Sequence, residues 1–300
     1  MTPVLEAVPN FSEGRDPALV REFARVIASE GAEVLARTAD PDHHRSVISF
    51  AGAPPVVERA ALAVARLAVE AIDLRRHTGV HPRVGALDVL PFIPARGLAM
   101  QDAAASARRV AKALAAMGIP VYLYGAAGAG RSLASLRAGG FEALVEGFPI
   151  GREPDILPRP WGHPGVHPTA GATCVGARPP LLAWNVCVSG LSLEQVKGIA
   201  CRLRESGGGF VGLRALGLYL PSSEVFQISM NLEDMERTPP MRVFEAIETE
   251  VDRLGGRVAQ TEVIGTIPEA VVLSAAASRL KLLDPDPSRL RGSLLAGVRS

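Results

Sequence analysis

The sequence predicts an α/β (α+β) protein with two similar subdomains, each a split β-α-β, ferredoxin-like sheet with helices packed mainly on one face. Three observations lead to this prediction. The chain has 300 residues, of which 48% are hydrophobic, so its length suits one large domain or two of moderate size. The order β-α-β-β-α-β can be read twice along the chain. A stretch rich in proline and glycine, from Phe148 to Pro180, separates the copies and is expected to be a linker.

The first copy fills about the first hundred residues. Asp16 is a favoured N-cap residue and Pro17 a favoured first helical residue, so they begin a helix that Gly31 can end. Two runs typical of strands flank the polar turn from Asp40 to Arg45, which predicts a hairpin. The predicted elements are a strand near Val4–Val8, a helix after Asp16, strands at Glu33–Ala39 and Ser46–Ala51, a helix from Val56 to about Leu74, and a strand at Ala86–Ile93.

A helix at Asp102–Met117 and a strand at Pro120–Tyr124 follow this copy. The next segment, Gly125 to Ser132, nearly matches a phosphate-binding loop, but Arg131 stands where that motif has lysine. We therefore expect a glycine-rich turn before a short helix here.

The second copy begins near Leu181. Its first helix has apolar residues at helical spacing, and its two middle strands flank the turn residues Pro221-Ser222-Ser223. With the boundary inside the Pro/Gly-rich stretch, the expected subdomains are residues 1–177 and 178–300. The predicted elements are strands at Leu181–Ser189, Val211–Leu220, Val225–Asn231 and Arg257–Ile264, with a helix from Leu193 to Leu203 and another from Phe244 to Leu254.

Charge and cysteine usage limit the class of protein. The formal net charge is +1, from 32 Lys and Arg against 31 Asp and Glu, which argues against a nucleic-acid binder with a broad basic face. The apolar run from Ala113 to Gly130 is interrupted by glycine and proline, so no membrane span is expected. Three cysteines without C-x-x-C spacing, and no apolar leader, predict a cytoplasmic protein.

The six histidines occur as three local pairs, which raises the question of a metal site. Two histidines four residues apart can chelate one ion when they lie on a helix. Glycine and proline interrupt both four-residue pairs, so this spacing loses its helical meaning, and no metal is expected. The pairs are His43 with His44, His77 with His81, and His163 with His167.

The segment from His77 to Asp88 is the first candidate for chemistry. From Leu74 to Leu87 the chain contains three arginines (Arg75, Arg76 and Arg83), both histidines and no Asp or Glu, and it leads directly into a predicted buried strand. A neutral imidazole in such a loop can accept or donate a proton near neutral pH, and Arg83 can bind an anionic group of the same substrate. The alternative is that His81 only caps the turn beside Pro82.

The segment from Pro160 to Thr173 is the second candidate. No Asp or Glu occurs between Ile156 and Leu193, and its glycines and prolines allow close approach of the backbone to a flat anionic molecule. The alternative is a plain interdomain linker. For the turn with Asp40, Asp42 and Arg45, a solvated turn and a substrate contact are equally good interpretations.

Four longer motifs resemble the glutamate formimidoyltransferase (formiminotransferase domain) family over nearly the whole chain. As the resemblance implies, the fold has two α/β subdomains that enclose a folate-binding tunnel, and the protein is a homodimer. The motifs are Val8-Pro-Asn-Phe-Ser-Glu-Gly14, His81-Pro-Arg-Val-Gly-Ala-Leu-Asp-Val-Leu-Pro-Phe-Ile-Pro94, Val121-Tyr-Leu-Tyr-Gly125 and Gly171-Ala-Thr-Cys-Val-Gly-Ala-Arg178.

The resemblance also implies an activity. The family transfers the formimidoyl group from N-formimidoyl-L-glutamate to N5 of tetrahydrofolate, its co-substrate, in histidine degradation and one-carbon metabolism. The family's catalytic histidine precedes the Pro-Arg of the long motif, which gives that role to His81. The folate-binding loop falls on Gly162, His163, Pro164, Gly165, Val166, His167, Pro168, Thr169, Ala170 and Gly171.

The chemistry of the substrate suggests further residues. Its carboxylates need fixed cations, and a carboxylate can orient the amidinium or the histidine. The substrate-binding candidates are Asn10, Asp40, Arg45, Arg83, Asp88 and Arg178.

Two alternatives stay open, and the first of them uses the same fold. One is formyl transfer between 5-formyltetrahydrofolate and glutamate, and the other is folate binding without catalysis. Because the chain has no room for the cyclodeaminase domain fused to the animal enzymes, a separate deaminase is expected to process the product.

Overall fold

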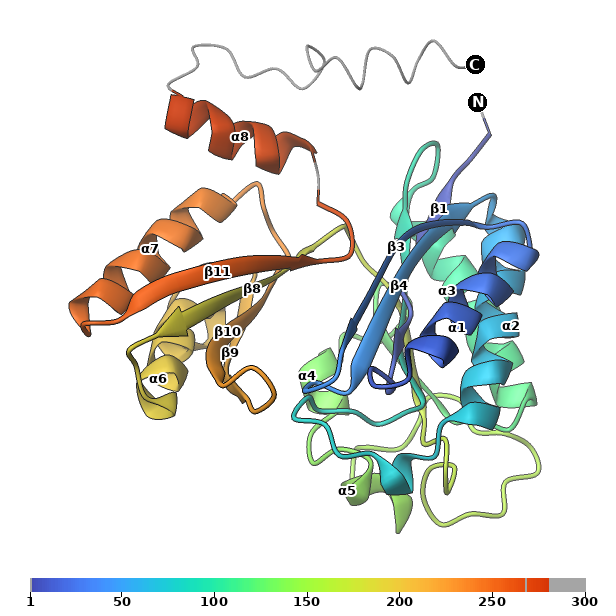
Figure 1. Ribbon diagram of the computed structural model, residues 1–300. Helices are drawn as coiled ribbons and strands as arrows, with labels where there is room; N and C mark the ends of the chain where they lie inside the picture. The colour runs from blue at the N-terminus through green and yellow to red at the C-terminus, as the bar shows by residue number, and fades with distance from the viewer. Residues whose placement is uncertain (1, 268, 281–300) are drawn as a thin grey trace. The chain divides into compact units, whose positions relative to one another are not determined.

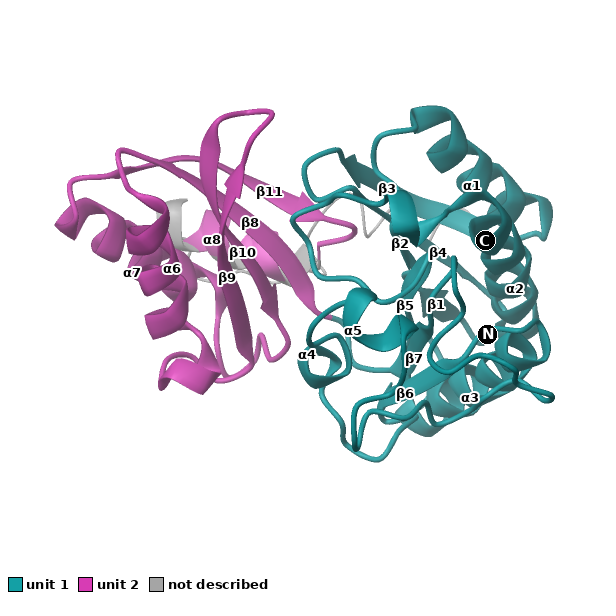
Figure 2. Cartoon of the chain, turned by 90° about the horizontal axis from the view of Figure 1, so that it is seen from below, with its two compact units in different colours: residues 1–180 teal, residues 181–300 magenta. Residues whose placement is uncertain are grey.

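The computed structural model describes residues 2–267 and 269–280 of the chain. The chain divides into two compact units, residues 1–180 and residues 181–300, coloured separately in Figure 2. Each unit has its own sheet with helices packed on it, so the predicted two-part α+β fold is confirmed. Pro180, the last residue of unit 1, lies three residues beyond the boundary predicted from the sequence.

Unit 1 begins with the predicted β-α-β-β-α-β order. Its first strand is interrupted by Val8 and Pro9, so it forms two short pieces that both pair with the same two neighbours. The sheet order β3, β4, β1 and β2, β5 places the first strand between the third and the fourth, as in a ferredoxin-like unit. The elements are β1 (Leu5–Ala7), β2 (Asn10–Phe11), α1 (Pro17–Ser29), β3 (Glu33–Asp40), β4 (Arg45–Gly52), α2 (Pro54–Ala71), the 3₁₀ turn Leu74–Arg76 and β5 (Leu87–Pro94).

Two parallel strands extend this sheet. β7 (Thr173–Ala177) lies between β5 and β6 (Val121–Gly125) and is parallel to both, after α3 (Met100–Ala116) has crossed over. β7 lies within the stretch predicted to be a linker, so that prediction is wrong. Its five residues are all buried, and a strand covered on both faces shows no alternation of polar and apolar residues that sequence reading could detect. The short helices α4 (Leu133–Leu136) and α5 (Glu142–Val145) lie between β6 and β7.

Helices α1, α2 and α3 cover one face of the unit 1 sheet (Figure 1). Asp16 caps α1 by accepting hydrogen bonds from two backbone N–H groups, as the sequence predicts. Phe23 on α1 stacks on Phe11 of β2 with ring centroids 4.4 Å apart, and α2 packs through a row of small alanine side chains. This packing fixes β2, β4 and β5, the strands that carry the candidate site.

Unit 2 repeats the ferredoxin-like order more simply. Its sheet order β11, β8, β10, β9 again places the first strand between the third and the fourth, with α6 and α7 packed against its core. No helix in the described part of the chain is long and apolar enough to cross a membrane. The elements are β8 (Leu182–Ser189), α6 (Leu193–Leu203), the 3₁₀ turn Glu205–Gly207, β9 (Leu213–Leu220), β10 (Val225–Leu232), α7 (Pro240–Arg253), β11 (Arg257–Ile264) and α8 (Glu269–Leu280).

Candidate functional site

The hairpin turn between β3 and β4 forms one side of the candidate site in unit 1. Asp40 Oδ1 accepts hydrogen bonds from the backbone N–H groups of Asp42 and His43, both at 2.8 Å. His44 closes the turn with a φ of 49°, a left-handed conformation that non-glycine residues seldom adopt. The candidate residue Asp40 therefore holds the shape of the turn that presents His43 and Arg45.

A network of hydrogen bonds connects Asn10, Arg45 and Asp88, three of the predicted residues. The register pairs Asn10 with Val47, so Asn10 and Arg45 lie on the same face of the sheet. Arg45 Nη1 donates to Asp88 Oδ2 at 2.8 Å, and its Nη2 donates to Asn10 Oδ1, also at 2.8 Å. Three residues from separate parts of the chain are thus brought together on neighbouring strands.

Asp88 owes its position to a bulge in β5. Asn10 pairs with Val89 and Phe11 with Leu87, which leaves Asp88 as the extra residue on that strand. The carboxylate is fully buried, and its Oδ1 accepts a hydrogen bond from the backbone N–H of Val84 at 2.7 Å. Burial alone would raise the pKa of Asp88, but the guanidinium groups of Arg45 and Arg137 outweigh it, so that the pKa is lowered.

Arg137, which the sequence did not single out, contributes the second guanidinium. It follows α4, and its Nη1 donates to Asp88 Oδ2 at 3.1 Å. Its side chain is 15% exposed and that of Arg45 is 10% exposed, so both charges are held in a mainly buried place. Two guanidinium groups share one carboxylate, and the three side chains together carry one net positive charge.

His81 lies beside this cluster. Its Nδ1 is 2.8 Å from the carbonyl oxygen of Pro82, and because a carbonyl only accepts, Nδ1 carries the proton. The neutral ring therefore has its lone pair on Nε2. Burial lowers the pKa of His81 well below 6.5, and the charges of Arg45 and Arg137 lower it further. The turn contact expected as the alternative is present, and it sets the tautomer that a proton acceptor needs.

His43 is a second imidazole near His81, with ring centroids 5.8 Å apart. His43 as a whole residue is 7% exposed, and its Nε2 has no hydrogen-bond partner. A buried polar atom without a partner is uncommon and often marks a place that a ligand completes. The sequence pointed to the pair of adjacent histidines but not to this role.

The other members of the histidine pairs support the loop before His81. His77 donates from Nε2 to the carbonyl oxygen of His44 at 2.8 Å, and the two rings stack with centroids 4.2 Å apart. Gly79 passes so close that a Cβ there would lie 2.3 Å from the carbonyl oxygen of His43. Burial lowers the pKa of His77 to about 4, so this ring stays neutral and structural near neutral pH.

Arg83 is already engaged in an ion pair. Its two terminal nitrogens contact both carboxylate oxygens of Glu142 on α5, at 2.5 and 3.1 Å. Arg83 is 11% exposed while Glu142 is 64% exposed. The carboxylate of Glu142 is the more exposed partner, and a substrate carboxylate at Arg83 would have to replace it.

The predicted folate-binding loop is joined by its second half to the segment that carries His81 and Asp88. Ala170 accepts a hydrogen bond from Ala86 N–H, and Ala172 N–H donates to Val84, at 2.8 and 2.9 Å. His167 Nδ1 accepts from the backbone N–H of Ala170 at 3.0 Å, which stabilises the turn. The loop therefore has a fixed base next to the histidine.

The first half of the loop offers free surface. Gly162, His163 and Pro164 are exposed, and the ring of His163 meets that of Trp161 edge-on, with centroids 4.9 Å apart. The indole Nε1 of Trp161 is buried without a hydrogen-bond partner. An aromatic residue, an imidazole and an unused donor are suitable contacts for a flat polar ligand.

Arg178 lies away from the cluster. Its backbone N–H donates to the carbonyl oxygen of Phe92, four residues along β5 from Asp88, or about 13 Å of strand. Its side chain donates to the carbonyl oxygen of Pro179 at 2.9 Å. The structure thus brings Asn10, Arg45 and Asp88 together beside His81, whereas Arg178 lies near the other end of the strand.

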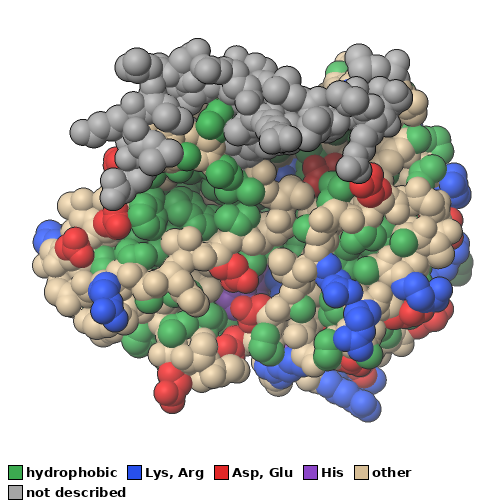
Figure 3. Space-filling model, turned by 45° about the horizontal axis from the view of Figure 1, so that its top comes forward, with side chains coloured by type: hydrophobic (Ala, Val, Ile, Leu, Met, Phe, Trp, Pro, Cys, Tyr) green, Lys and Arg blue, Asp and Glu red, His purple; other side chains and the backbone are tan. Residues whose placement is uncertain are grey.

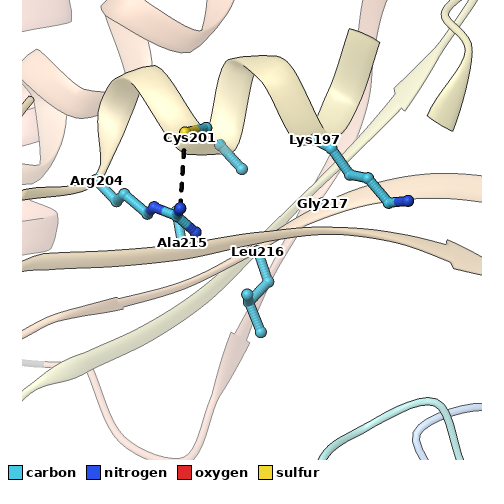
Figure 4. Close-up of a pocket in the computed structure, with 7 residues that line it drawn as sticks. Lys197, Cys201, Arg204, Ala215, Leu216 and Gly217 are labelled. Carbon is cyan, nitrogen blue, oxygen red and sulfur yellow. Dashed lines mark hydrogen bonds between the residues drawn. The ribbon is translucent and has the colours of Figure 1, made fainter. Parts of the chain in front are cut away.

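A shallow cavity in unit 2, of about 340 Å³, offers a weaker candidate between α6 and β9 (Figure 4). Its two cations have partners: Lys197 pairs with Glu194 at 3.0 Å, and an Arg204 nitrogen lies 3.6 Å from Cys201 Sγ. On the face drawn in Figure 3, basic and acidic side chains are interspersed rather than gathered into a basic surface. Within residues 2–267 and 269–280, no group of three or more His, Cys, Asp or Glu residues is arranged to hold a metal ion.

Comparison with known proteins covers both units. Residues 4–178 match the N-terminal subdomain of the formiminotransferase domain, and residues 183–281 match the formiminotransferase domain family. The chain is 35% identical over 291 residues to a glutamate formimidoyltransferase of Streptococcus pyogenes, covering 95% of this chain and 96% of that protein. It is 37% identical to a glutamate formimidoyltransferase of Thermoplasma acidophilum, with 93% of each chain covered.

A longer relative aligns only in part. The chain is 40% identical over 288 residues to the formimidoyltransferase-cyclodeaminase of Sus scrofa, which covers 92% of this chain and 52% of the pig protein. The chain thus spans about half the length of that relative.

Proposed function

Because the chain belongs to the formiminotransferase domain family, we propose that it is a glutamate formimidoyltransferase with His81 as the residue that moves the proton. In this function the chain transfers a formimidoyl group from N-formimidoyl-L-glutamate to N5 of tetrahydrofolate, in histidine degradation. The relatives from Streptococcus and Thermoplasma, matched over nearly their whole length, support the activity. The observation that carries the mechanism is a neutral imidazole with its Nε2 free, held beside a buried cluster with net positive charge.

The first step forms a bond and moves a proton. The N5 amine of tetrahydrofolate attacks the carbon of the amidinium group. As the N5–C bond forms, the π-electron pair of the C=N bond moves onto the terminal nitrogen, which becomes a neutral NH2 group. Nε2 of His81 accepts the proton that N5 loses, which the lowered pKa of His81 permits by keeping the ring neutral. The product of this step is a tetrahedral carbon that carries three nitrogens.

The second step breaks a bond and returns the proton. The protonated His81 donates from Nε2 to the nitrogen of the glutamate moiety, and the bond between that nitrogen and the tetrahedral carbon breaks. Glutamate leaves, and the C=N double bond re-forms on 5-formimidoyltetrahydrofolate. His81 ends as it began, and burial together with the neighbouring guanidinium charges makes its protonated form a stronger acid than an ordinary imidazolium.

The folate loop, Gly162–Gly171, is proposed to hold the acceptor substrate. Its fixed base shares hydrogen bonds with the backbone from Val84 to Ala86, so that a ligand on the loop lies close to the His81 segment. The unpartnered indole Nε1 of Trp161 supplies a donor for a polar group. Holding both substrates at this place supplies the effective concentration that a two-substrate transfer requires.

Three further features of the function are proposals as well. The three cysteines are free thiols, which fits a reducing compartment such as the cytoplasm. A homodimer is expected of the family. The pig relative is named for a cyclodeaminase as well as for the transferase, so a cyclodeaminase is the proposed consumer of the product.

The test is an assay of the purified protein with tetrahydrofolate and N-formimidoyl-L-glutamate, run beside a reaction with 5-formyltetrahydrofolate and glutamate. Formation of 5-formimidoyltetrahydrofolate, followed by absorbance, is the expected result. Turnover only in the formyl reaction would replace the proposed substrate. Folate binding without turnover in either reaction would make the protein a binder and would remove the proposed activity.

A further inference from the structure

Arg137 has a hydrogen-bonding edge that the structure leaves unused. Its guanidinium reaches Asp88 through Nη1 alone, and its Nε is buried without a hydrogen-bond partner. Asp88 is also its only salt-bridge partner among the described residues. Arg45 differs, because its Nη1 donates to Asp88 while Nε and Nη2 both donate to Asn10.

The charge of the cluster makes this edge suitable for an anion. Asp88 supplies one negative charge to two guanidinium groups, and its Oδ1 is occupied by the N–H of Val84. A mainly buried arginine with an unmatched charge is costly unless a partner completes it. The Nε–Nη2 edge of a guanidinium matches the two oxygens of a carboxylate, with which it can form two parallel hydrogen bonds.

The turn after α4 holds Arg137 next to the catalytic segment. Gly140 N–H donates to the carbonyl oxygen of Arg137 at 3.0 Å, and Gly139 and Gly140 have φ values of 72° and 68°. A Cβ on Gly140 would lie 3.4 Å from the carbonyl oxygen of Arg83 and 2.9 Å from a carboxylate oxygen of Glu142. Glycine at 140 therefore lets this turn approach the loop that carries His81.

We propose that the free edge of Arg137 binds the α-carboxylate of N-formimidoyl-L-glutamate, with Asp88 and Arg45 fixing the guanidinium in place. This inference rests on the proposed function, and it adds a residue that neither the motifs nor the comparisons assign. The α-carboxylate is chosen because it is attached to the carbon that bears the reacting nitrogen. A carboxylate held beside His81 therefore brings that nitrogen within reach of the proton on the ring.

The first experiment compares Arg137→Gln with the native protein. Losing a charge-assisted pair of hydrogen bonds is expected to raise KM for N-formimidoyl-L-glutamate roughly ten- to a hundredfold. KM for tetrahydrofolate should change less than about twofold, since the acceptor does not use this edge. Arg137→Lys keeps the positive charge but loses the paired N–H groups of the guanidinium. Its KM for N-formimidoyl-L-glutamate should therefore lie between those of the native protein and of Arg137→Gln. Arg66→Gln, at an exposed position on α2, is the matched control and should change neither KM.

The second experiment changes the substrate instead of the protein. An analogue with the α-carboxylate replaced by an amide should lose about the same factor in kcat/KM with the native protein as Arg137→Gln loses with the true substrate. Arg137→Gln assayed with the α-amide analogue should have a kcat/KM only slightly lower than either change alone gives, since both changes remove the same interaction. For an analogue with an amide in place of the γ-carboxylate, the fold loss in kcat/KM should instead multiply with the fold loss caused by Arg137→Gln, because the two changes remove different interactions.

The outcomes separate this inference from the proposed function. If native protein turns over the substrate but Arg137→Gln leaves its KM unchanged, or raises both KM values equally, Arg137 does not bind the carboxylate. If the losses in kcat/KM caused by Arg137→Gln and by the γ-amide analogue do not multiply, the assignment to the α-carboxylate is overturned. If the native protein shows no transfer at all, the proposed function fails, and calorimetry with L-glutamate still decides the site: binding weakened by Arg137→Gln supports it, and equal binding rejects it.

Discussion

The β3–β4 hairpin of unit 1 and the β9–β10 hairpin of unit 2 have strands of equal length and four-residue turns, but their chemistry differs. In unit 1, β3 and β4 are eight residues each and enclose the turn from Pro41 to His44. In unit 2, β9 and β10 are also eight residues each and enclose the turn from Pro221 to Glu224. His44 and Glu224, the last residue of each turn, are the non-glycine residues with positive φ in the described part of the chain, at 49° and 54°.

The side chains on this shared backbone diverge. The unit 1 turn ends at Arg45, which enters the buried charge cluster, whereas the unit 2 turn ends at Val225 and its own four residues are exposed. A similar contrast holds for the bulge in the last strand of each β-α-β-β-α-β repeat: the extra residue is Asp88 in β5 and Ala259 in β11. The repeated geometry is a property of the fold, and the candidate chemistry lies in the residues that only unit 1 places on it.

The largest effect is expected at His81, in the loop that precedes β5 of unit 1. The segment that precedes β11 in unit 2 contains no histidine. His81→Asn should lower kcat by a factor of ~10²–10⁴, because the proton from N5 then has no positioned acceptor. Steady-state kinetics with both substrates would measure it, and the KM values should change little. His163→Asn, on the exposed half of the folate loop, is the matched comparison and should act on KM for tetrahydrofolate instead. An unchanged kcat in His81→Asn would remove this residue from the mechanism.

The second prediction uses the burial of Asp88. Asp88→Ala leaves two mainly buried guanidinium groups without their carboxylate, so the free energy of unfolding should fall by about 3–5 kcal/mol. Glu142→Ala removes a carboxylate from Arg83 at a position that is 64% exposed, and should cost no more than about 1 kcal/mol. Urea unfolding of both variants measures the difference. Equal losses of unfolding free energy in the two variants would show that burial adds nothing to the contribution of the cluster to stability.

The sequence carried enough information to predict the repeated fold and two of the three charged residues of the cluster, Arg45 and Asp88. Asp16 with Pro17, and the turn that ends at Arg45, are local signals, since capping and turn formation depend on neighbouring residues. Asp88 stands in a motif next to His81 and could be found there. These features were predictable because each is encoded within a few residues.

Arg137 and β7 were missed for a physical reason. Arg137 meets Asp88 across 49 residues of sequence, and nothing in its own segment distinguishes it from a solvated arginine after a short helix. β7 is buried on both faces, so its small residues read as part of a loop. His43 reads as a polar turn residue, yet in the structure it is buried with its ring near that of His81. Long-range partners and burial are decided by tertiary packing.

The third prediction concerns the pH dependence of kcat/KM. His81 must be neutral to accept a proton, and its pKa is lowered well below 6.5 by burial, by Arg45 and Arg137, and by His43. The acid limb of the profile should therefore lie below pH 6.5 in the native protein. Removing one positive charge in Arg137→Gln favours the protonated ring, which raises its pKa and moves the limb to higher pH.

Arg66→Gln on α2 controls for a general effect of losing a charge and should leave the limb in place. A limb that moves to lower pH in Arg137→Gln, or does not move, would contradict the electrostatic account of His81. Because the KM effect of Arg137→Gln comes from a separate contact, the limb should shift even at saturating N-formimidoyl-L-glutamate, where kcat is measured.

The smallest effect tests the shared backbone of the two turns directly. A non-glycine residue with left-handed backbone costs about 1–2 kcal/mol, so Glu224→Gly at an exposed position should raise the free energy of unfolding by roughly 0.5–1 kcal/mol. His44→Gly relieves the same strain but removes the ring that stacks on His77 and contacts Glu13 at 3.5 Å, so no gain is expected. Urea unfolding measures both variants. If both gain equally, the contacts of His44 stabilise nothing, and the two turns differ in sequence alone.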